Sequence, residues 1–336
     1  MKKKHTHLIL SLLLVAALIF LSACGLKKDN TADKASSDAD LRGKTFTVGT
    51  SGDFDRQIWE DVGKRLKEKK GINLKTMGFS EFIQPDRALQ EGTIDANSYQ
   101  YTPFLYETSK NWDLDLVPIG YAQMTPIGIW APKSKPLKSL KDVKDGMKLA
   151  IGRDPVVLDN ELRQLEKAGL ITMPKDTSKM YTIDDIQSNP HHLKFQEVDS
   201  ASMMSFVDDS DIFVTHASVA GLADYKPEEA LYLEDPKKMS DDFKLVFAVR
   251  RDRKDDPLVK AVLDEYQTED TKKIMDKVTH GMFLPAWNDK DREADNKHAY
   301  EHFEELKKKR DKEAESSKDS SKQSESKQDE SKSESK

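Results

Sequence analysis

Few residues in this chain of 336 have the types and spacing that a catalytic or metal centre requires. The sequence contains no His-Glu-x-x-His pair, no Gly-x-Ser-x-Gly nucleophile turn and no Gly-x-x-x-x-Gly-Lys phosphate loop. His191 and His192 are adjacent in a predicted turn, so they point in different directions. Acidic pairs such as Asp208 and Asp209 fall at predicted element ends, where capping accounts for them. The sequence therefore predicts no enzyme, no metal and no other cofactor.

Cys24 is the only cysteine, so disulfides and thiolate metal sites are excluded. It follows Leu21-Ser22-Ala23, at the end of an apolar run that Lys2-Lys3-Lys4 precede. Positive charge, apolar run and small residues, in this order, make a secretory signal. A small-residue site that ends in cysteine resembles a bacterial lipobox, which implies cleavage before Cys24 and acylation of its sulfur. The alternative is a cysteine that happens to lie in a signal peptide or a short membrane anchor.

The apolar run from Leu8 to Leu21 is shorter than the roughly 20 residues of a membrane-spanning helix. We therefore predict a lipoprotein signal peptide over residues 1–23 and a flexible, polar tether over 24–43. The mature protein is expected to be lipid-anchored at the extracytoplasmic face of the cell membrane. The tether and the tail are rich in Lys and Ser, which favours a Gram-positive cell surface.

The chain carries 54 Lys and Arg against 60 Asp and Glu, a formal net charge of -6, which argues against nucleic acid as a partner. Residues 288–336 form a charged extension. From about residue 313 it is almost wholly Ser, Lys, Glu, Asp and Gln, so it cannot bury enough apolar surface to fold and is predicted to be disordered. The folded part is expected to span about residues 44–287.

Strand and helix patterns alternate through this folded part. Phe54, Ile58, Val62 and Leu66 recur every four residues and predict a helix. A further helix is predicted over 201–207, and a long one from Pro257 that continues past Ile274. Strands are predicted over 44–49, 72–79, 116–121, 126–131, 148–151, 193–198, 212–214 and 243–249, and residues 94–99 form a short stretch that is apolar and polar by turns. This alternation predicts α/β layers with largely parallel sheets.

The helix predicted over 155–168 has Asp154 as its N-cap and directly follows a strand. The free N–H groups and the dipole of such a helix start favour an anion, and an amino-acid carboxylate would fit. An ordinary capped helix that binds nothing is the alternative interpretation.

Several short motifs, in this order and spacing, resemble the NlpA-type, methionine-binding lipoprotein family of ABC importers. The resemblance implies an α/β fold of the two-lobed, periplasmic-binding-protein-like (clamshell) type, with two inter-lobe crossings that we place near Pro126 and Asp241. Lobe 1 would comprise 44–126 and 241–287, and lobe 2 would comprise 127–240. It also implies a ligand in the inter-lobe cleft, and an ABC permease with its ATPase as partners. The motifs are Ile83-Gln84-Pro85, Gly92-Thr93-Ile94-Asp95-Ala96-Asn97, Leu114-Asp115-Leu116-Val117-Pro118-Ile119-Gly120, Pro126-Ile127-Gly128-Ile129, Lys167-Ala168-Gly169-Leu170, Asn189-Pro190 and Leu284-Pro285-Ala286-Trp287.

The chain departs from the family pattern at the ligand positions. The family reads Asn-Asp-Pro-Thr-Asn-Glu-Gly-Arg where this chain has residues 153–160, so the carboxylate-pairing Arg of the family falls on Asn160. Arg153 or Arg163 could replace that cation. A ligand-binding Asn of the family falls on Thr215.

A second departure lies at residues 97–101, where the family reads Asn-Tyr-Phe-Gln-His and this chain has Asn-Ser-Tyr-Gln-Tyr. Tyr99 and Tyr101 could clamp an apolar or thioether side chain, or could simply pack in the cleft wall. The predicted ligand-binding residues are Tyr99, Tyr101, Arg153, Asn160, Arg163 and Thr215.

The leading hypothesis is a membrane-anchored solute-binding lipoprotein of an ABC importer. Its ligand would be methionine, a related amino acid or a short peptide. The alternative is a surface lipoprotein of the same fold that has lost transport and acts in adhesion or host contact. A surface enzyme is the weakest hypothesis, because no catalytic constellation is visible.

Overall fold

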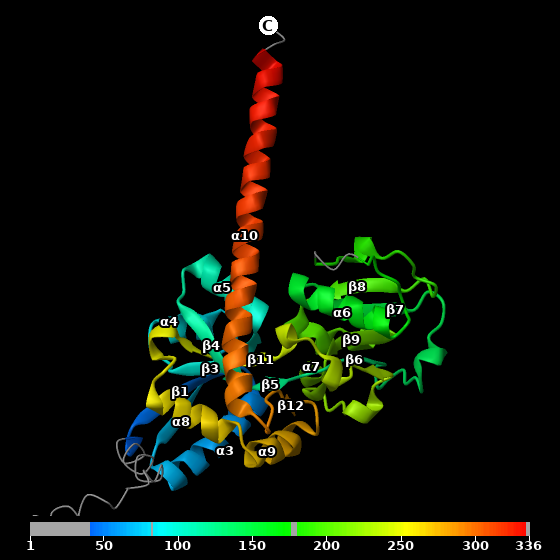
Figure 1. Ribbon diagram of the computed structural model, residues 1–336. Coiled ribbons are helices and arrows are strands. Elements are labelled where there is room, and N and C mark those ends of the chain that lie inside the picture. The colour runs from blue at the N-terminus through cyan, green and yellow to red at the C-terminus, as the bar shows by residue number, and fades with distance from the viewer. Residues whose placement is uncertain (1–40, 82, 176–179, 334–336) are drawn as a thin grey trace, which may run out of the picture. The chain divides into compact units, whose positions relative to one another are not determined.

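A computed structural model describes residues 41–81, 83–175 and 180–333 (Figure 1). Contacts within the chain define two units, Met1–Arg42 and Gly43–Lys336, and the strands of the described residues lie in the second. The predicted signal peptide, Cys24 and the tether up to residue 40 lie outside the described residues. Within the described part, no helix is both long enough and apolar enough to cross a membrane.

The first of two five-stranded sheets has the order β2-β1-β3-β11-β4. β1 pairs in parallel with β2 and β3, whereas β11 is antiparallel to both of its neighbours, β3 and β4. The apolar period of four residues in α3 buries Ile58, Val62 and Leu66. The strands are β1 (Thr45–Thr50), β2 (Asn73–Gly78), β3 (Ala96–Tyr101), β4 (Leu116–Tyr121) and β11 (Leu245–Arg250), and the helices that alternate with them are α3 (Asp53–Lys70), α4 (Gln84–Gln90), α5 (Thr102–Trp112) and α8 (Pro257–Tyr266).

The second sheet has the order β10-β6-β9-β7-β8. β7 is parallel to β8 and β9, while β6 is antiparallel to β9 and β10. Leu158, Leu162 and Leu165 of α6 are buried in the core against this sheet. The elements are β6 (Ile127–Trp130), β7 (Lys148–Gly152), α6 (Pro155–Lys167), β8 (Lys194–Val198), β9 (Ile212–His216), α7 (Ala217–Gly221) and β10 (Tyr232–Leu233).

The chain passes between the two sheets twice, from β4 to β6 and back from β10 to β11. The predicted two-lobed α/β fold with two crossings is therefore confirmed. Along the first crossing, β5 (Gln123–Met124) pairs with β12 (Leu284–Pro285). Both sheets are more mixed than predicted, because a strand that arrives from the other sheet, without a helical crossover, need not run parallel to its neighbours.

Two predicted helices differ in the structure. The long helix predicted from Pro257 is two helices, α8 and α9 (Glu269–Thr279), because Thr268 accepts a hydrogen bond from the Thr271 N–H and starts a new helix. The stretch predicted as a helix over 201–207 is 3₁₀-helical, in Ser200–Ser205 and Val207–Asp209. Serine side chains compete for backbone hydrogen bonds and so weaken a regular α-helix there.

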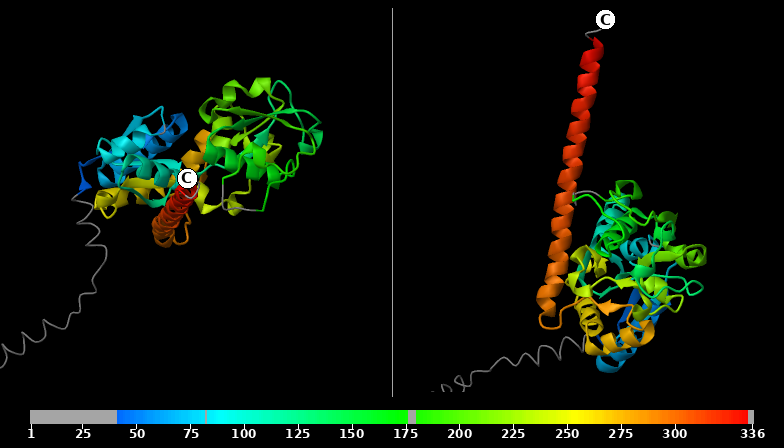
Figure 2. Two further views of the ribbon diagram at one scale, coloured as in Figure 1. Left: turned by 90° about the horizontal axis from the view of Figure 1, so that it is seen from above. Right: turned by 90° about the vertical axis from the view of Figure 1, so that its right-hand side faces the viewer.

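α10 (Arg292–Ser333) is a single uninterrupted helix (Figures 1 and 2). Its first part packs against β4 and α5, with Ala299 and Phe303 buried. The Tyr106 hydroxyl of α5 donates to Asp311 at 2.8 Å. From residue 313 the helix continues through the stretch that is predicted to be disordered. That stretch has one apolar residue, Ala314, so its helicity depends on local propensity alone, and its disorder in solution stays a prediction.

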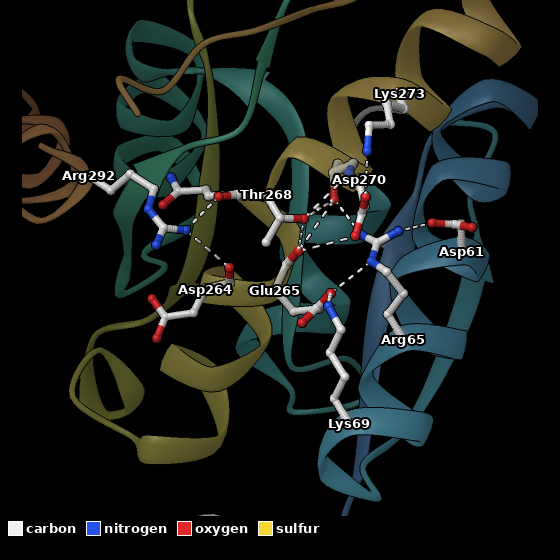
Figure 3. A network of polar contacts seen from close by, with 11 residues as sticks. Asp61, Arg65, Lys69, Asp264, Glu265, Thr268, Asp270, Lys273 and Arg292 are labelled. Carbon is white, nitrogen blue, oxygen red and sulfur yellow. Dashed lines mark hydrogen bonds and ion pairs between the residues drawn. The ribbon is translucent and has the colours of Figure 1, made fainter. Parts of the chain in front are cut away.

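Side chains from α3 and α10 donate hydrogen bonds to the C-terminal end of α8. Arg65 reaches from α3 to this end, where its Nε donates to Glu265 Oε1 at 2.8 Å (Figure 3). Lys69 Nζ lies 2.8 Å from the same oxygen. The Arg65 and Glu265 side chains are only 11% and 6% exposed, so this pair is shielded from water. Arg292 donates to the Asp264 carbonyl at 3.4 Å on the other side of the helix end.

Replacing Arg65 by Met should lower the free energy of unfolding by about 2–4 kcal/mol, because a buried Glu265 would keep only Lys69 as a charged partner. Arg56→Met on the same helix is the matched control. Arg56 pairs with Asp53 and Glu60, but it is 43% exposed and screened by water, so its loss should destabilise the protein much less than the loss of Arg65. Urea unfolding of both variants measures the difference. Equal losses would contradict the importance of burial at Arg65.

Candidate functional site

Buried polar side chains follow the ends of three strands. β3 ends at Tyr101, β7 ends at Gly152 and β9 ends at His216. Ligands of α/β proteins bind at the carboxyl ends of strands, because the loops there leave backbone and side-chain polar groups available. These strand ends, together with the helix α6 that follows β7, form the candidate site.

Tyr101 and His216 join the first sheet to the second. The Tyr101 hydroxyl lies 3.2 Å from Nε2 and 3.3 Å from Nδ1 of His216. Phe243 packs edge-on against the Tyr101 ring, with centroids 5.9 Å apart. Burial lowers the pKa of His216 to about 4, so the imidazole is neutral at pH 7. Burial also raises the pKa of Tyr101, and the negative charges of Glu234 and Glu161 add to this shift.

α6 buries polar residues on one side and leucines on the other. Asn160 and Glu161 are 2% and 0% exposed, and Gln164 one turn later is 1% exposed. Glu161 Oε2 accepts a hydrogen bond from the Gly152 N–H at 2.7 Å, where β7 ends. Burial raises the pKa of Glu161 well above its usual value, and the charge of Asp154 raises it further. A carboxyl in this environment binds its proton more tightly than a carboxyl in water does.

Glu234 lies on the other side of Gln164. Its Oε1 accepts from Gln164 Nε2 at 2.7 Å, and its Oε2 accepts from the Ile127 N–H at 3.3 Å. Lys167 Nζ lies 3.5 Å from Oε1. Burial raises the pKa of Glu234 despite these partners. Glu234 is therefore held by three donors that fix the second crossing against β6 and α6.

The six predicted ligand-binding residues divide into two groups. Tyr101, Asn160 and Thr215 are at the strand ends or on the polar side of α6. Thr215 is 1% exposed in β9, next to His216, and Asn160 accepts from Gln164 Nε2 at 3.4 Å. These three residues belong to the candidate site.

Tyr99, Arg153 and Arg163 have other partners. Burial raises the pKa of Tyr99, and the charge of Asp86 in α4 adds to the shift, which places Tyr99 beside that carboxylate. Arg153 is 62% exposed and pairs with Asp199 at 3.2 Å. Arg163 pairs with Asp159 at 3.0 Å and lies over the Tyr181 ring at 4.3 Å. Both arginines are thus engaged with partners other than Asn160.

Sequence reasoning missed His216, Glu161, Gln164 and Glu234 as parts of this site. Glu161 could have been found, since it falls between Leu158 and Leu162 on the buried side of a predicted helix. An acid at such a position is rarely tolerated without a role. No comparable sequence signal marks Glu234, because it lies in a segment where apolar residues do not recur at a regular spacing.

Asp55 is a further buried acid, in the first turn of α3 just after β1. It is 2% exposed, and its Oδ2 accepts from the Ser51 N–H at 3.1 Å. Burial raises its pKa to about 7. Burial raises the pKa of Tyr266, and the charge of Asp55 adds to this shift. The first lobe therefore also carries a carboxyl with an unusual proton affinity at a strand end.

Two α/β sheets linked by two crossings, with polar side chains at their strand ends, define the chain as a solute-binding protein of the two-lobed class, and its relatives are binding proteins and not enzymes. The NlpA lipoprotein family matches residues 46–287, which span both sheets and both crossings. The chain belongs to this family.

Two named relatives and one solved structure are similar to this chain. The D-methionine-binding lipoprotein MetQ of Salmonella typhi is 33% identical over 245 residues, which are 71% of this chain and 88% of that protein. Lipoprotein 28 of Escherichia coli K12 is 30% identical over 292 residues, which are 85% of this chain and 100% of that protein. A nutrient binding protein from Burkholderia cenocepacia, solved bound to methionine, is 33% identical with a TM-score of 0.65, over 72% of this chain and all of that one.

The pKa of Asp55 predicts a pH dependence of stability. Between about pH 4 and pH 7 the folded protein keeps a proton on Asp55 that the unfolded chain has lost, so this group makes stability fall as pH rises. Asp55→Asn removes that contribution. The free energy of unfolding of the variant minus that of the wild type should rise by up to about 1.4 kcal/mol per pH unit across this window.

Urea unfolding at pH 4 to 8 measures this difference, and the opposite contribution of His216 cancels because both proteins contain it. Asp53→Asn is the matched control in the same turn of α3. Hydrogen bonds from Arg56 lower the pKa of Asp53, so this control should show no rise between pH 4 and pH 7. A flat difference for Asp55→Asn would contradict the assignment.

Proposed function

We propose that this chain is the membrane-anchored solute-binding lipoprotein of an ABC importer, with methionine, a related amino acid or a short peptide as its ligand. The observation that carries the proposal is the family match over residues 46–287, together with relatives named for methionine binding at about one-third identity. In the proposal the ligand lies between lobe 1, residues 44–126 and 241–287, and lobe 2, residues 127–240.

The proposed mechanism is binding followed by closure of the lobes about the two crossings. A ligand that contacts both lobes favours the closed form because it binds that form more tightly. Tyr101 and His216 support this role, since their contact joins β3 of one sheet to β9 of the other. The closed form is then what an ABC permease and its ATPase would recognise at the extracytoplasmic face.

The choice of ligand depends on Asn160. A free amino acid bound through its carboxylate would meet an amide there, and a charge-assisted pair is about twice as strong as a neutral hydrogen bond. The ligand of this chain therefore need not be the ligand of its relatives. The same departure supports the second candidate function, a surface lipoprotein that has lost transport and acts in adhesion or host contact.

Thermal unfolding of the full-length protein in detergent, after refolding to remove bound solute, tests the proposal. The panel contains L- and D-methionine, the other amino acids and short peptides. A ligand at 100 times its dissociation constant should add about 2.7 kcal/mol of stability and raise the melting temperature by a few degrees. A flat panel on folded protein would favour the second candidate.

Tyr101→Phe should weaken binding of any solute found in this panel by roughly 2- to 10-fold, because one hydrogen bond at the site is lost. Tyr225→Phe is the matched control. The Tyr225 hydroxyl accepts from the Lys133 N–H at 3.1 Å in the second lobe, away from the strand ends, so its loss should leave affinity unchanged.

We also propose that Cys24 carries the lipid that holds the protein at the membrane of a Gram-positive cell. Cys24→Ser should abolish metabolic labelling with an alkyne-tagged palmitate and move the protein from the membrane fraction to the medium. Ser22→Ala, a substitution by another small residue just before the cleavage site, should keep both properties. Labelling that persists in Cys24→Ser would overturn the assignment of the anchor.

A further inference from the structure

Glu161 is a buried carboxyl with one oxygen left unbonded. Its side chain is fully buried, and Oε2 accepts from the Gly152 N–H at 2.7 Å. Among the residues that the structure describes, none donates a hydrogen bond to Oε1. Desolvating a polar atom without a partner is costly, so such an atom calls for an explanation.

Glu234, in the same lobe, is a buried carboxyl whose hydrogen bonds are complete and whose role is structural. It is 4% exposed, and both of its oxygens accept hydrogen bonds, from Gln164 and from the Ile127 N–H. Lys167 also lies within 3.5 Å of it. Within the described part of the chain, Glu161 has one backbone donor, and the charge of the acidic Asp154 acts on it. Packing alone therefore does not account for Glu161.

The position of Glu161 points to a ligand. Its carboxylate lies at the carboxyl end of β7, where a Cβ added to Gly152 would lie 3.2 Å from Oε2. It acts electrostatically on Tyr101, which reaches this place from the other sheet. It also directly follows Asn160, the position at which the family pattern has a cation. This part of α6 therefore has an amide at the position of the family cation and an acid next to it in the sequence.

We propose that Oε1 of Glu161 receives the ammonium group of the bound solute, so that the ligand is an organic amine whose amino end points towards α6. The inference rests on the proposed solute-binding function and specifies its ligand class. A free amine and the amino end of a short peptide share this chemistry. An α-carboxylate next to the amine is not required.

Proton release gives the inference a readout that does not depend on affinity. Burial raises the pKa of Glu161, so without ligand it binds a proton more tightly than a carboxyl in water does. An ammonium group favours the charged carboxylate and lowers this pKa again, so amine binding should release protons to the buffer in the pH range where Glu161 titrates. Isothermal titration at several pH values, each in two buffers of different ionisation enthalpy, counts the protons. Release should reach up to one proton per amine bound.

The probes are two matched pairs, titrated into the full-length protein in detergent. 3-(Methylthio)propylamine carries an ammonium without a carboxylate, and N-acetyl-L-methionine carries a carboxylate without an ammonium. The dipeptide Met-Gly and its N-acetyl form repeat the comparison for a peptide. The amines should bind and the acetylated probes should not, and a preference for one pair identifies the source of the amino group.

Glu161→Gln should weaken amine binding by about 10- to 100-fold and abolish proton release, because the neutral amide keeps the Gly152 bond but offers no charge. Glu166→Gln is the matched control. Glu166 is exposed on the same helix and also accepts one backbone N–H, from Met173 at 2.9 Å, so its replacement should change neither quantity. Circular dichroism checks that both variants fold.

The outcomes separate the inference from the function on which it rests. Binding of the acetylated probes as tightly as of the amines, or binding of the amines by wild-type protein without proton release, overturns the role of Glu161 and leaves the solute-binding function standing. No binding of any probe or of any solute in the amino-acid panel overturns both.

Discussion

The fold depends on one strand that arrives late in the chain. β11 (Leu245–Arg250) lies between β3 and β4, forms the ladders to both and is buried along most of its length. The first sheet is therefore incomplete until the chain has built the second sheet and returned. This constraint fixes two connections between the sheets, and two connections restrict any relative motion of the lobes to a hinge. It also places Tyr101, which pairs with Leu245, at the edge where the returning chain enters.

Burial at the strand ends determines the charge state of the site. His216, Glu161 and Glu234 lie in surroundings that disfavour their charged forms, and burial is the first cause of each pKa shift. Burial thus opposes the charged form of each group, while hydrogen bonds hold each side chain in place. The free-energy cost of removing polar groups from water is offset for Glu234 by its hydrogen-bond donors. For Glu161 it is offset only in part. A site of this kind gains most from a ligand that brings the missing charge.

The sequence predicted the larger features of the fold and only part of the site. The apolar period of four residues predicted α3, and Asp154 as N-cap predicted the start of α6. The break between α8 and α9 was missed, since the apolar period continues through it and only Thr268 marks a new start. Arg163 was predicted as a possible replacement cation from its place one turn after Asn160, but its partner Asp159 and the Tyr181 ring are set by tertiary packing. Glu161 meets the Gly152 N–H, and Glu234 meets Gln164, only through the fold of the second lobe.

A scaffold shared by a family does not fix the charge of its ligand. The strand ends and the start of α6 offer backbone N–H groups that suit an anion, but side chains next to them decide the net preference. In this chain the position of the family cation holds Asn160, and the residue after it is the acidic Glu161. Losing a cation removes a positive charge, and ionisation of Glu161 next to a bound amine would add a negative one, so the two effects act in the same direction. Under the proposal, the electrostatic preference of the site is thereby turned from carboxylate towards amine.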